Sequence, residues 1–152
     1  MRLNLLLLML ILVSRISIAG EDAILETARR THRPVSEIQE HHLEGCATGI
    51  TTYMNICAEY HYVKSDLKLN QTYTSLLAKL KGKPVATSQL VKAQRAWVTF
   101  RDLTCEFESN GWSGGSGRSM VVLTCKSVLT ESRTKTLQEY LECTEGCPGD
   151  GG

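Results

Sequence analysis

The chain has 152 residues, a length typical of one domain, and 22% of them are charged. Its 17 basic and 16 acidic residues nearly cancel. This balance argues against a protein that binds nucleic acid or lies on an anionic membrane surface through a basic patch. Six cysteines, an even number, are the most distinctive feature of the composition.

Residues 1–19 have the organisation of a secretory signal peptide. Arg2 gives a positive start, and an unbroken apolar run over residues 5–13 is shorter than the ~20 residues that span a bilayer. Small residues at Ser17 and Ala19 fit a cleavage site, so we predict cleavage after Ala19 and a periplasmic or secreted protein without a stable membrane anchor. A retained anchor is the alternative.

The six cysteines predict disulfides, because a protein behind an export signal folds in an oxidising compartment. The count allows many pairings, and the sequence alone does not choose among them. Proximity along the chain favours Cys46–Cys57, Cys105–Cys125 and Cys143–Cys147. Each bond would contribute ~2–4 kcal/mol, mainly by restricting the unfolded chain.

Residues 20–45 form an N-terminal extension that we expect to contain short helical pieces. Residues 21–30 can make one short helix, and Pro34 interrupts its extension. Residues 36–43 can make another turn or two of helix before Gly45.

The first long helix is predicted from near Thr52 to a break at Gly82 and Pro84, with Thr51 or Thr52 as its N-terminal cap. Its apolar side chains recur at three- and four-residue steps and so form one stripe. The stripe consists of Met54, Cys57, Ala58, His61, Leu69, Tyr73, Leu76, Leu77 and Leu80.

Two more helices are predicted, one starting after Thr87 or Ser88 and one starting near Ser119. The buried face of the second helix is predicted to hold Leu90, Ala93, Trp97, Phe100 and Phe107. The stripe of the third is Val122, Cys125, Leu129, Leu137 and Leu141. With no convincing strand alternation, the predicted fold is all-α: a disulfide-stapled bundle of three main helices plus short N-terminal helical pieces. A glycine-rich tail over residues 144–152 is expected to be flexible.

Residues 110–117 include four glycines and therefore predict a loop between the second and third helices. Trp112 lies within this loop and Arg118 at its end, and both residue types dominate binding hot spots. A disulfide across the loop would limit the ordering cost of association. We therefore predict a partner-binding loop with Trp112, Gly114, Gly115 and Arg118. The alternative is that Trp112 folds back onto the bundle.

Four polar residues are predicted to form a structural network inside the bundle. Asp66 and Asn70 are four residues apart on the first long helix, and Gln94 and Arg101 share a face of the second. A partly buried charge needs a partner, so we expect Arg101 to pair with Asp66, with Asn70 and Gln94 satisfying neighbouring groups. A binding or catalytic constellation is the less favoured interpretation.

No catalytic or cofactor motif is recognisable. The glycine-rich loop lacks the spacing of a serine nucleophile elbow and is followed by no phosphate-binding lysine motif. His32, His41, His42 and His61 are not spaced for metal chelation, and Cys143 and Cys147 in an exported chain favour a disulfide over zinc. The sequence thus predicts a binding protein that is not an enzyme and needs no metal or cofactor.

Three spaced motifs lie in residues 52–58 (Thr-Tyr-Met-Asn-Ile-Cys-Ala), residues 94–102 (Gln-Arg-Ala-Trp-Val-Thr-Phe-Arg-Asp) and residues 114–116 (Gly-Gly-Ser). Taken together, they resemble the "T-x-x-E-M-N-x-C-A" opening, the "Q-R-A-W-x-x-[FY]-R-D" stretch and the glycine-rich loop of the LprI-type lysozyme inhibitor family of small secreted bacterial domains. The single positions that also match are Asp66, Leu69, Asn70, Tyr73, Cys105, Cys125, Leu129, Thr130, Arg133 and Leu137. Tyr53 departs from the pattern, since the family has an acidic residue there.

The resemblance extends over about residues 46–141, and we assign residues 46–143 to an LprI-like helical domain. It implies an exported binding protein that inhibits lysozyme or a related peptidoglycan-cleaving enzyme. The alternative is an envelope protein, such as an immunity protein or an assembly scaffold, that binds another protein partner without inhibiting lysozyme.

Overall fold

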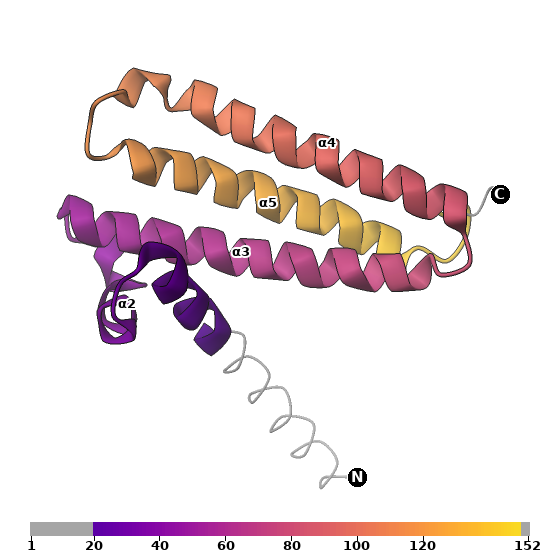
Figure 1. Ribbon diagram of the computed structural model, residues 1–152, viewed down its shortest axis with the longest axis horizontal. Coiled ribbons are helices and arrows are strands. Elements are labelled where there is room, and N and C mark those ends of the chain that lie inside the picture. The colour runs from indigo at the N-terminus through magenta and orange to yellow at the C-terminus, as the bar shows by residue number, and fades with distance from the viewer. Residues whose placement is uncertain (1–19, 150–152) are drawn as a thin grey trace, which may run out of the picture. The chain divides into compact units, whose positions relative to one another are not determined.

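The computed structural model describes residues 20–149, whose regular secondary structure is entirely helical (Figure 1). The predicted all-α class is confirmed. The signal peptide predicted over residues 1–19 lies outside the described residues. The chain divides into two compact units, the first ending at Lys64 and the second beginning at Ser65. Among residues 20–149, no helix combines the length and the apolar character needed to cross a membrane.

The first unit contains the short N-terminal helices that the sequence predicted. Residues 20–31 are helical, and Pro34 immediately precedes helix α2 (Val35–His41). The 3-10 turn η1 (Glu44–Ala47) leads to α3 (Thr51–Lys79), which begins in the first unit and ends in the second. Pro34 suits the position before α2 because the first N–H groups of a helix have no intrahelical acceptor.

The core of the first unit is a small apolar cluster closed by a disulfide. Ala28, Ile38 and Ile56 are buried together. Cys46 and Cys57 are bonded with their Cα atoms 5.4 Å apart, which ties η1 to α3. At Gly45, a Cβ atom would lie 2.6 Å from the carbonyl oxygen of Tyr53, so the two backbones approach closely here and only glycine fits.

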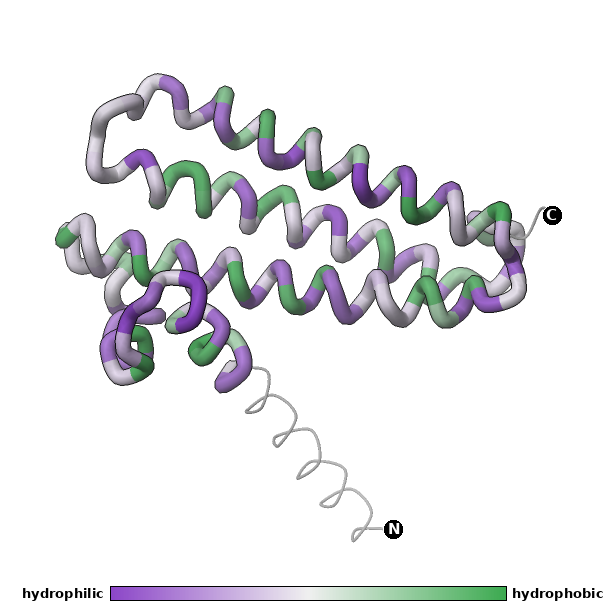
Figure 2. Tube along the Cα trace, viewed as in Figure 1, coloured by the Kyte–Doolittle hydropathy of each residue, from purple (hydrophilic) through white to green (hydrophobic). Residues whose placement is uncertain are grey.

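The second unit holds the rest of α3, then α4 (Pro84–Glu108), the 3-10 turn η2 (Asn110–Trp112) and α5 (Arg118–Glu142). Figure 1 shows α4 and α5 running alongside each other, joined at one end by the glycine-rich loop. Figure 2 shows hydrophobic and hydrophilic residues alternating along all three helices, as expected of helices with one face packed against neighbours.

Leucines form the apolar part of the second unit. Leu69 and Leu76 from α3, and Leu80 directly after that helix, are buried together with Leu137 from α5. The stripe predicted for the first long helix is confirmed at these α3 positions and at Cys57 and Ala58, which are also buried. It is wrong at one position, because the side chain of His61 is exposed.

Helix α4 begins at Pro84, four or five residues before the predicted start. The proline therefore opens the helix after the break at Gly82. Thr87, which the prediction placed before the helix, lies within its first turn and donates a hydroxyl hydrogen bond to the Leu80 carbonyl oxygen at 3.3 Å.

The buried face predicted for α4 is wrong at Ala93, which is exposed, and in its second half. Phe100 is 57% exposed and Phe107 is 79% exposed, whereas Arg101 and Cys105 are buried. Neighbouring residues on a helix point about 100° apart, so Phe100 and Arg101 cannot both face inward. The disulfide between Cys105 and Cys125, with Cα atoms 5.5 Å apart, fixes which of the two faces is inside.

The end of α5 is held by a lysine and by the last disulfide. Lys79 Nζ donates hydrogen bonds to the carbonyl oxygens of Tyr140, Leu141 and Cys143 at 3.2, 2.9 and 2.7 Å, which satisfies groups left without intrahelical partners. Cys143 is bonded to Cys147. The tail packs against the unit as far as Gly149, where an added Cβ would lie 3.0 Å from atoms of Leu80 and Ala86. The flexibility predicted for residues 144–152 stays a prediction, and of these residues the structure describes only 144–149.

Candidate partner-binding surface

The glycine-rich loop closes one end of the α4–α5 pair and is framed by a covalent bond. Cys105 lies near the end of α4 and Cys125 about two turns into α5, and their disulfide spans a sequence separation of 20 residues. The backbone between them is therefore restricted before any partner arrives. Such restriction reduces the conformational entropy lost on binding.

Within this frame the loop backbone makes a series of tight turns. Trp112 N–H donates to the Ser109 carbonyl oxygen at 2.9 Å, Gly115 N–H to that of Trp112 at 3.0 Å, and Arg118 N–H to that of Gly115 at 3.2 Å. Gly114 has a φ of +80°, in the left-handed region that favours glycine. The two predicted loop glycines thus shape the turn that follows Trp112.

The Trp112 side chain is 54% exposed. A Cβ atom placed on Gly117 would lie 3.9 Å from the six-membered ring of the indole, so part of the ring covers the loop backbone. The sequence left open whether Trp112 points to solvent or folds onto the bundle. The structure shows an arrangement between these two alternatives. The ring rests against its own loop and still presents about half of its surface.

Arg118 is engaged by the protein itself. Its guanidinium forms an ion pair with Glu106, which links the start of α5 to the last turns of α4. The side chain is 32% exposed, against 62% for its glutamate partner. In this geometry Arg118 braces the loop rather than presenting an unpaired cation to a partner.

A shallow groove of about 460 Å³ lies beside the loop in the second unit. Its apolar lining comes mostly from α5, where Val128 is 59% exposed. The lining includes Met120, Val121, Val128 and Leu129. Sequence reasoning missed this groove, although the run of apolar residues from Met120 to Leu123 is too wide for a single buried stripe and could have indicated it.

The predicted structural network is grouped around Arg101. Its Nη1 atom lies 3.8 Å from Asp66 Oδ1, and its Nη2 atom lies 3.0 Å from Oδ1 of the adjacent Asp102. Lys126 Nζ lies 3.1 Å from the same Asp102 oxygen. Burial alone would raise the pKa of Asp102, but hydrogen bonds from Arg101 and Lys126 outweigh it and lower that pKa. Sequence reasoning found the Asp66 contact and missed Asp102.

The other two predicted members of the network lie elsewhere. Gln94 accepts a hydrogen bond from Arg133 Nε at 3.0 Å, and Asn70 is exposed. The guanidinium carbons of Arg101 and Arg133 lie 5.2 and 5.9 Å from the Trp97 ring centroid. The interior between α3, α4 and α5 thus changes from leucines to a charged and aromatic layer.

Potential metal ligands come together at one place among the described residues. The sulfur atoms of Cys46 and Cys57 and a ring nitrogen of His61 lie within 4.8 Å of one another. Because the two sulfurs are joined in a disulfide, neither is a thiolate in this state, and thiolate is the form that binds metal. The prediction that the protein needs no metal stays a prediction.

Comparison with known proteins supports the family suggested by the motifs. The family described as Lysozyme inhibitor LprI matches residues 45–137, which include α3, α4, the glycine-rich loop and most of α5. An uncharacterized protein of Rhizobium meliloti (strain 1021) is 36% identical over 103 residues, which cover 60% of this chain and 74% of that relative. No solved structure matches.

The matched segment contains the disulfide-framed loop, the Arg101 layer and the first two cysteine pairs, whereas the helical residues 20–31 and α2 lie outside it. The family is named for inhibition and not for a catalytic activity. On the motifs, the helical fold and this match, the chain belongs to the LprI lysozyme inhibitor family.

Proposed function

We propose that this chain acts outside the cytoplasm as a binding protein that inhibits a lysozyme or a related peptidoglycan-cleaving enzyme and carries out no catalysis of its own. Family membership over residues 45–137 is the observation that carries this proposal. The signal-like residues 1–19 and the three disulfides support an exported location.

The contact surface that we propose is the loop end of the second unit, with Trp112 at its centre. Enzymes that cleave polysaccharides bind several sugar units in a concave cleft, and a loop that projects from the end of a helix pair can enter such a cleft. A tryptophan that is 54% exposed supplies contact area, and the Cys105–Cys125 bond limits the entropy lost on docking.

A cell-wall lysis assay tests the proposal. The purified protein, without residues 1–19, is mixed in excess with lysozymes of different structural types, and the fall in turbidity of a cell-wall suspension is followed. We expect slower lysis by at least one type. An unchanged lysis rate with every type of lysozyme would contradict the proposed inhibition and favour the alternative, binding to another envelope protein.

The loop is tested separately with two variants. Trp112→Ala should weaken inhibition by at least tenfold, the range of an interface hot spot of ~1.4 kcal/mol or more, while the circular dichroism spectrum stays that of the wild type. Val85→Ala, at the other end of α4 and also well exposed at 62%, is the matched control and should inhibit normally. Equal inhibition by both variants would move the contact surface away from the loop.

A further inference from the structure

The disulfide of the first unit has a histidine beside it. Cys57 and His61 are four residues apart on α3, so their side chains lie on the same face of that helix. Cys46 reaches this face from η1, and the two sulfur atoms and a ring nitrogen of His61 lie within 4.8 Å of one another. Sequence reasoning compared the histidines only with one another and the cysteines only as bonded pairs, and therefore missed this combination.

The spacing of these three atoms fits a thiophilic cation. Zn²⁺ binds thiolate sulfur at ~2.3 Å and imidazole nitrogen at ~2.0–2.1 Å, so the ligand atoms of a tetrahedral site are about 3.5–3.8 Å apart. Groups that already lie within 4.8 Å reach these separations through small rotations of their side chains. Three protein ligands leave the fourth position to water, and Cu⁺ also prefers thiolate and imidazole ligands.

The two sulfur atoms become ligands only after the disulfide is reduced, and a dithiol can reduce it. One thiolate of the dithiol attacks the Cys46 sulfur, which forms a mixed disulfide and releases Cys57 as a thiolate. The second thiol of the reductant then displaces Cys46, and the reductant leaves as a disulfide. Two electrons and two protons pass to the protein, and binding of a cation by the two cysteines releases both protons.

The Cys46–Cys57 bond is the disulfide that a reductant reaches most readily. All six cysteines lie within residues 20–149, and Cys46 is exposed whereas the other five are buried or half-buried. Thiol–disulfide exchange requires access of the attacking thiolate to a sulfur atom. Reduction should therefore begin at Cys46 and leave the two disulfides of the second unit closed.

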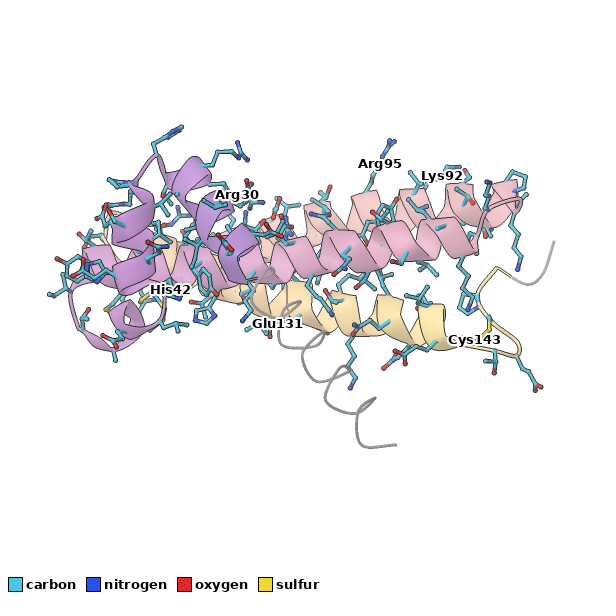
Figure 3. The ribbon with its side chains drawn as sticks, turned by 90° about the horizontal axis from the view of Figure 1, so that it is seen from below. Arg30, His42, Lys92, Arg95, Glu131 and Cys143 are labelled. Carbon is cyan, nitrogen blue, oxygen red and sulfur yellow. A yellow bond between two sulfur atoms is a disulfide. The ribbon has the colours of Figure 1, made fainter. Side chains whose placement is uncertain are left out.

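Contacts other than the disulfide hold the chain around η1 against α3. The His41 ring stacks on the Tyr53 ring with centroids 3.7 Å apart, and the His42 ring meets the Tyr60 ring edge-on at 4.7 Å (Figure 3). The backbone at Gly45 approaches the Tyr53 carbonyl closely. These contacts remain when the bond opens, so the two thiols stay near each other and lose little conformational entropy on binding a cation.

From the ligand spacing, the access to Cys46 and these contacts, we propose that reduction of the Cys46–Cys57 disulfide opens a site for one Zn²⁺ or Cu⁺ ion, held by Cys46, Cys57 and His61. Cys57 is 0% exposed, so its thiolate is a buried charge that needs a partner, and the cation supplies it. The oxidised protein has no thiolate here and does not bind the ion. The inference does not rest on the proposed function.

The order of reduction is tested first. The chain from Gly20 onward is treated with increasing concentrations of dithiothreitol, the thiols formed are alkylated, and mass spectrometry of peptides locates them. We expect Cys46 and Cys57 to be alkylated at a lower dithiol concentration than the other four cysteines. Earlier opening of either other disulfide would overturn the inference.

Metal binding by the selectively reduced protein is tested next. The reductant is removed under nitrogen, and Zn²⁺ and Cu⁺ are each titrated in competition with a chromophoric chelator, while circular dichroism checks that the helices persist. We expect one ion of at least one of the two metals to bind per chain, at least about tenfold more tightly than to the oxidised protein. Displacement of one metal by the other shows which ion the site prefers. Equal affinities of the reduced and oxidised proteins for both metals would overturn the inference.

Variants separate this site from the other thiols and histidines. His61→Ala removes one of three ligands at an exposed position and should weaken binding by the reduced protein at least about tenfold. His32→Ala, at another exposed histidine of the first unit, is the matched control and should bind as the wild type does. The double variant Cys46→Ser, Cys57→Ser should bind neither ion at this site. Equal affinities of the two histidine variants, or binding retained by the double variant, would overturn the inference.

Discussion

Arg101 shows how one buried charged side chain connects the elements of the second unit. It is 5% exposed, contacts Asp66 of α3 and Asp102 of its own helix, and lies over the Trp97 ring. It also donates a hydrogen bond to Thr130 of α5 at 3.4 Å. A buried charge without such partners is costly, so these positions constrain one another.

Replacement of Arg101 by alanine should destabilise the protein strongly. The change leaves Asp66 without its cation and opens a space beside Trp97, and we expect a loss of ~2–4 kcal/mol. Chemical denaturation followed by circular dichroism measures it. Arg95→Ala is the matched control, since this arginine is exposed on the same helix, and it should change stability by less than ~0.5 kcal/mol. Equal effects would show that Arg101 holds no structural network.

Glu26 provides a second test at the scale of a residue. Hydrogen bonds from Arg29 and Arg30, at 2.7 and 2.8 Å, lower the pKa of Glu26 from 4.5 to about 2. A folded-state pKa below the unfolded one stabilises the native state above about pH 4.5, and this contribution is lost as the pH falls towards 2. An NMR titration of the Glu26 carboxyl should show the lowered value. The double variant Arg29→Gln, Arg30→Gln should return it to the ordinary range; an unchanged value there would refute the assigned cause.

At the scale of elements, the Cys105–Cys125 disulfide has two consequences. It closes the loop between α4 and α5, and it fixes the inward face of α4 by holding Cys105 inside. The positions of Leu90, Trp97 and Arg101 on that inward face follow from the helical repeat. The opposite face, with Phe100 and Phe107, is then left outside.

Removal of this disulfide should lower both stability and loop order. The double variant Cys105→Ser, Cys125→Ser releases a loop of about 20 residues, and we expect a loss of ~3 kcal/mol. Thermal unfolding measures the loss, and hydrogen exchange across residues 109–118 measures the loop. The double variant Cys143→Ser, Cys147→Ser should lose less stability, because the disulfide that it removes closes a separation of only 4 residues. A larger cost there would contradict this account.

At the scale of the whole molecule, the chain has two compact units that share one helix. Each has its own buried cluster, around Ile38 in the first and around Leu137 in the second. Stability can therefore differ between the units, because regions with separate cores open with separate free energies.

Cavity-forming substitutions in each core test this separation. Ile38→Ala should cost ~2–4 kcal/mol and increase amide exchange over residues 20–47, while the amides of α4 and α5 remain protected. Leu137→Ala is the reciprocal variant and should act mainly on α4 and α5. Isoleucine and leucine side chains are isomers, and both of these are at 0% exposure, so the two substitutions remove the same number of atoms from fully buried sites. If both variants expose the same amides, the protein unfolds as one unit.

The sequence by itself determined the helical class, the three long helices, the position of the loop and the family. These follow from local signals: a repeat of three and four residues, glycine and proline breaks, and the spacing of cysteines. The sequence also predicted the Arg101–Asp66 contact, because a buried charge needs a partner of opposite charge.

Tertiary structure alone decided where the inward face of α4 lies, because Trp97 and Phe100 are three residues apart and periodicity alone places both on the buried stripe. It decided that Asn70 is exposed and that Arg118 pairs with Glu106, since these depend on which helices lie side by side and in what register. Local sequence sets the direction of a side chain relative to its own helix. What that side chain meets is set by the packing of segments far apart in the chain.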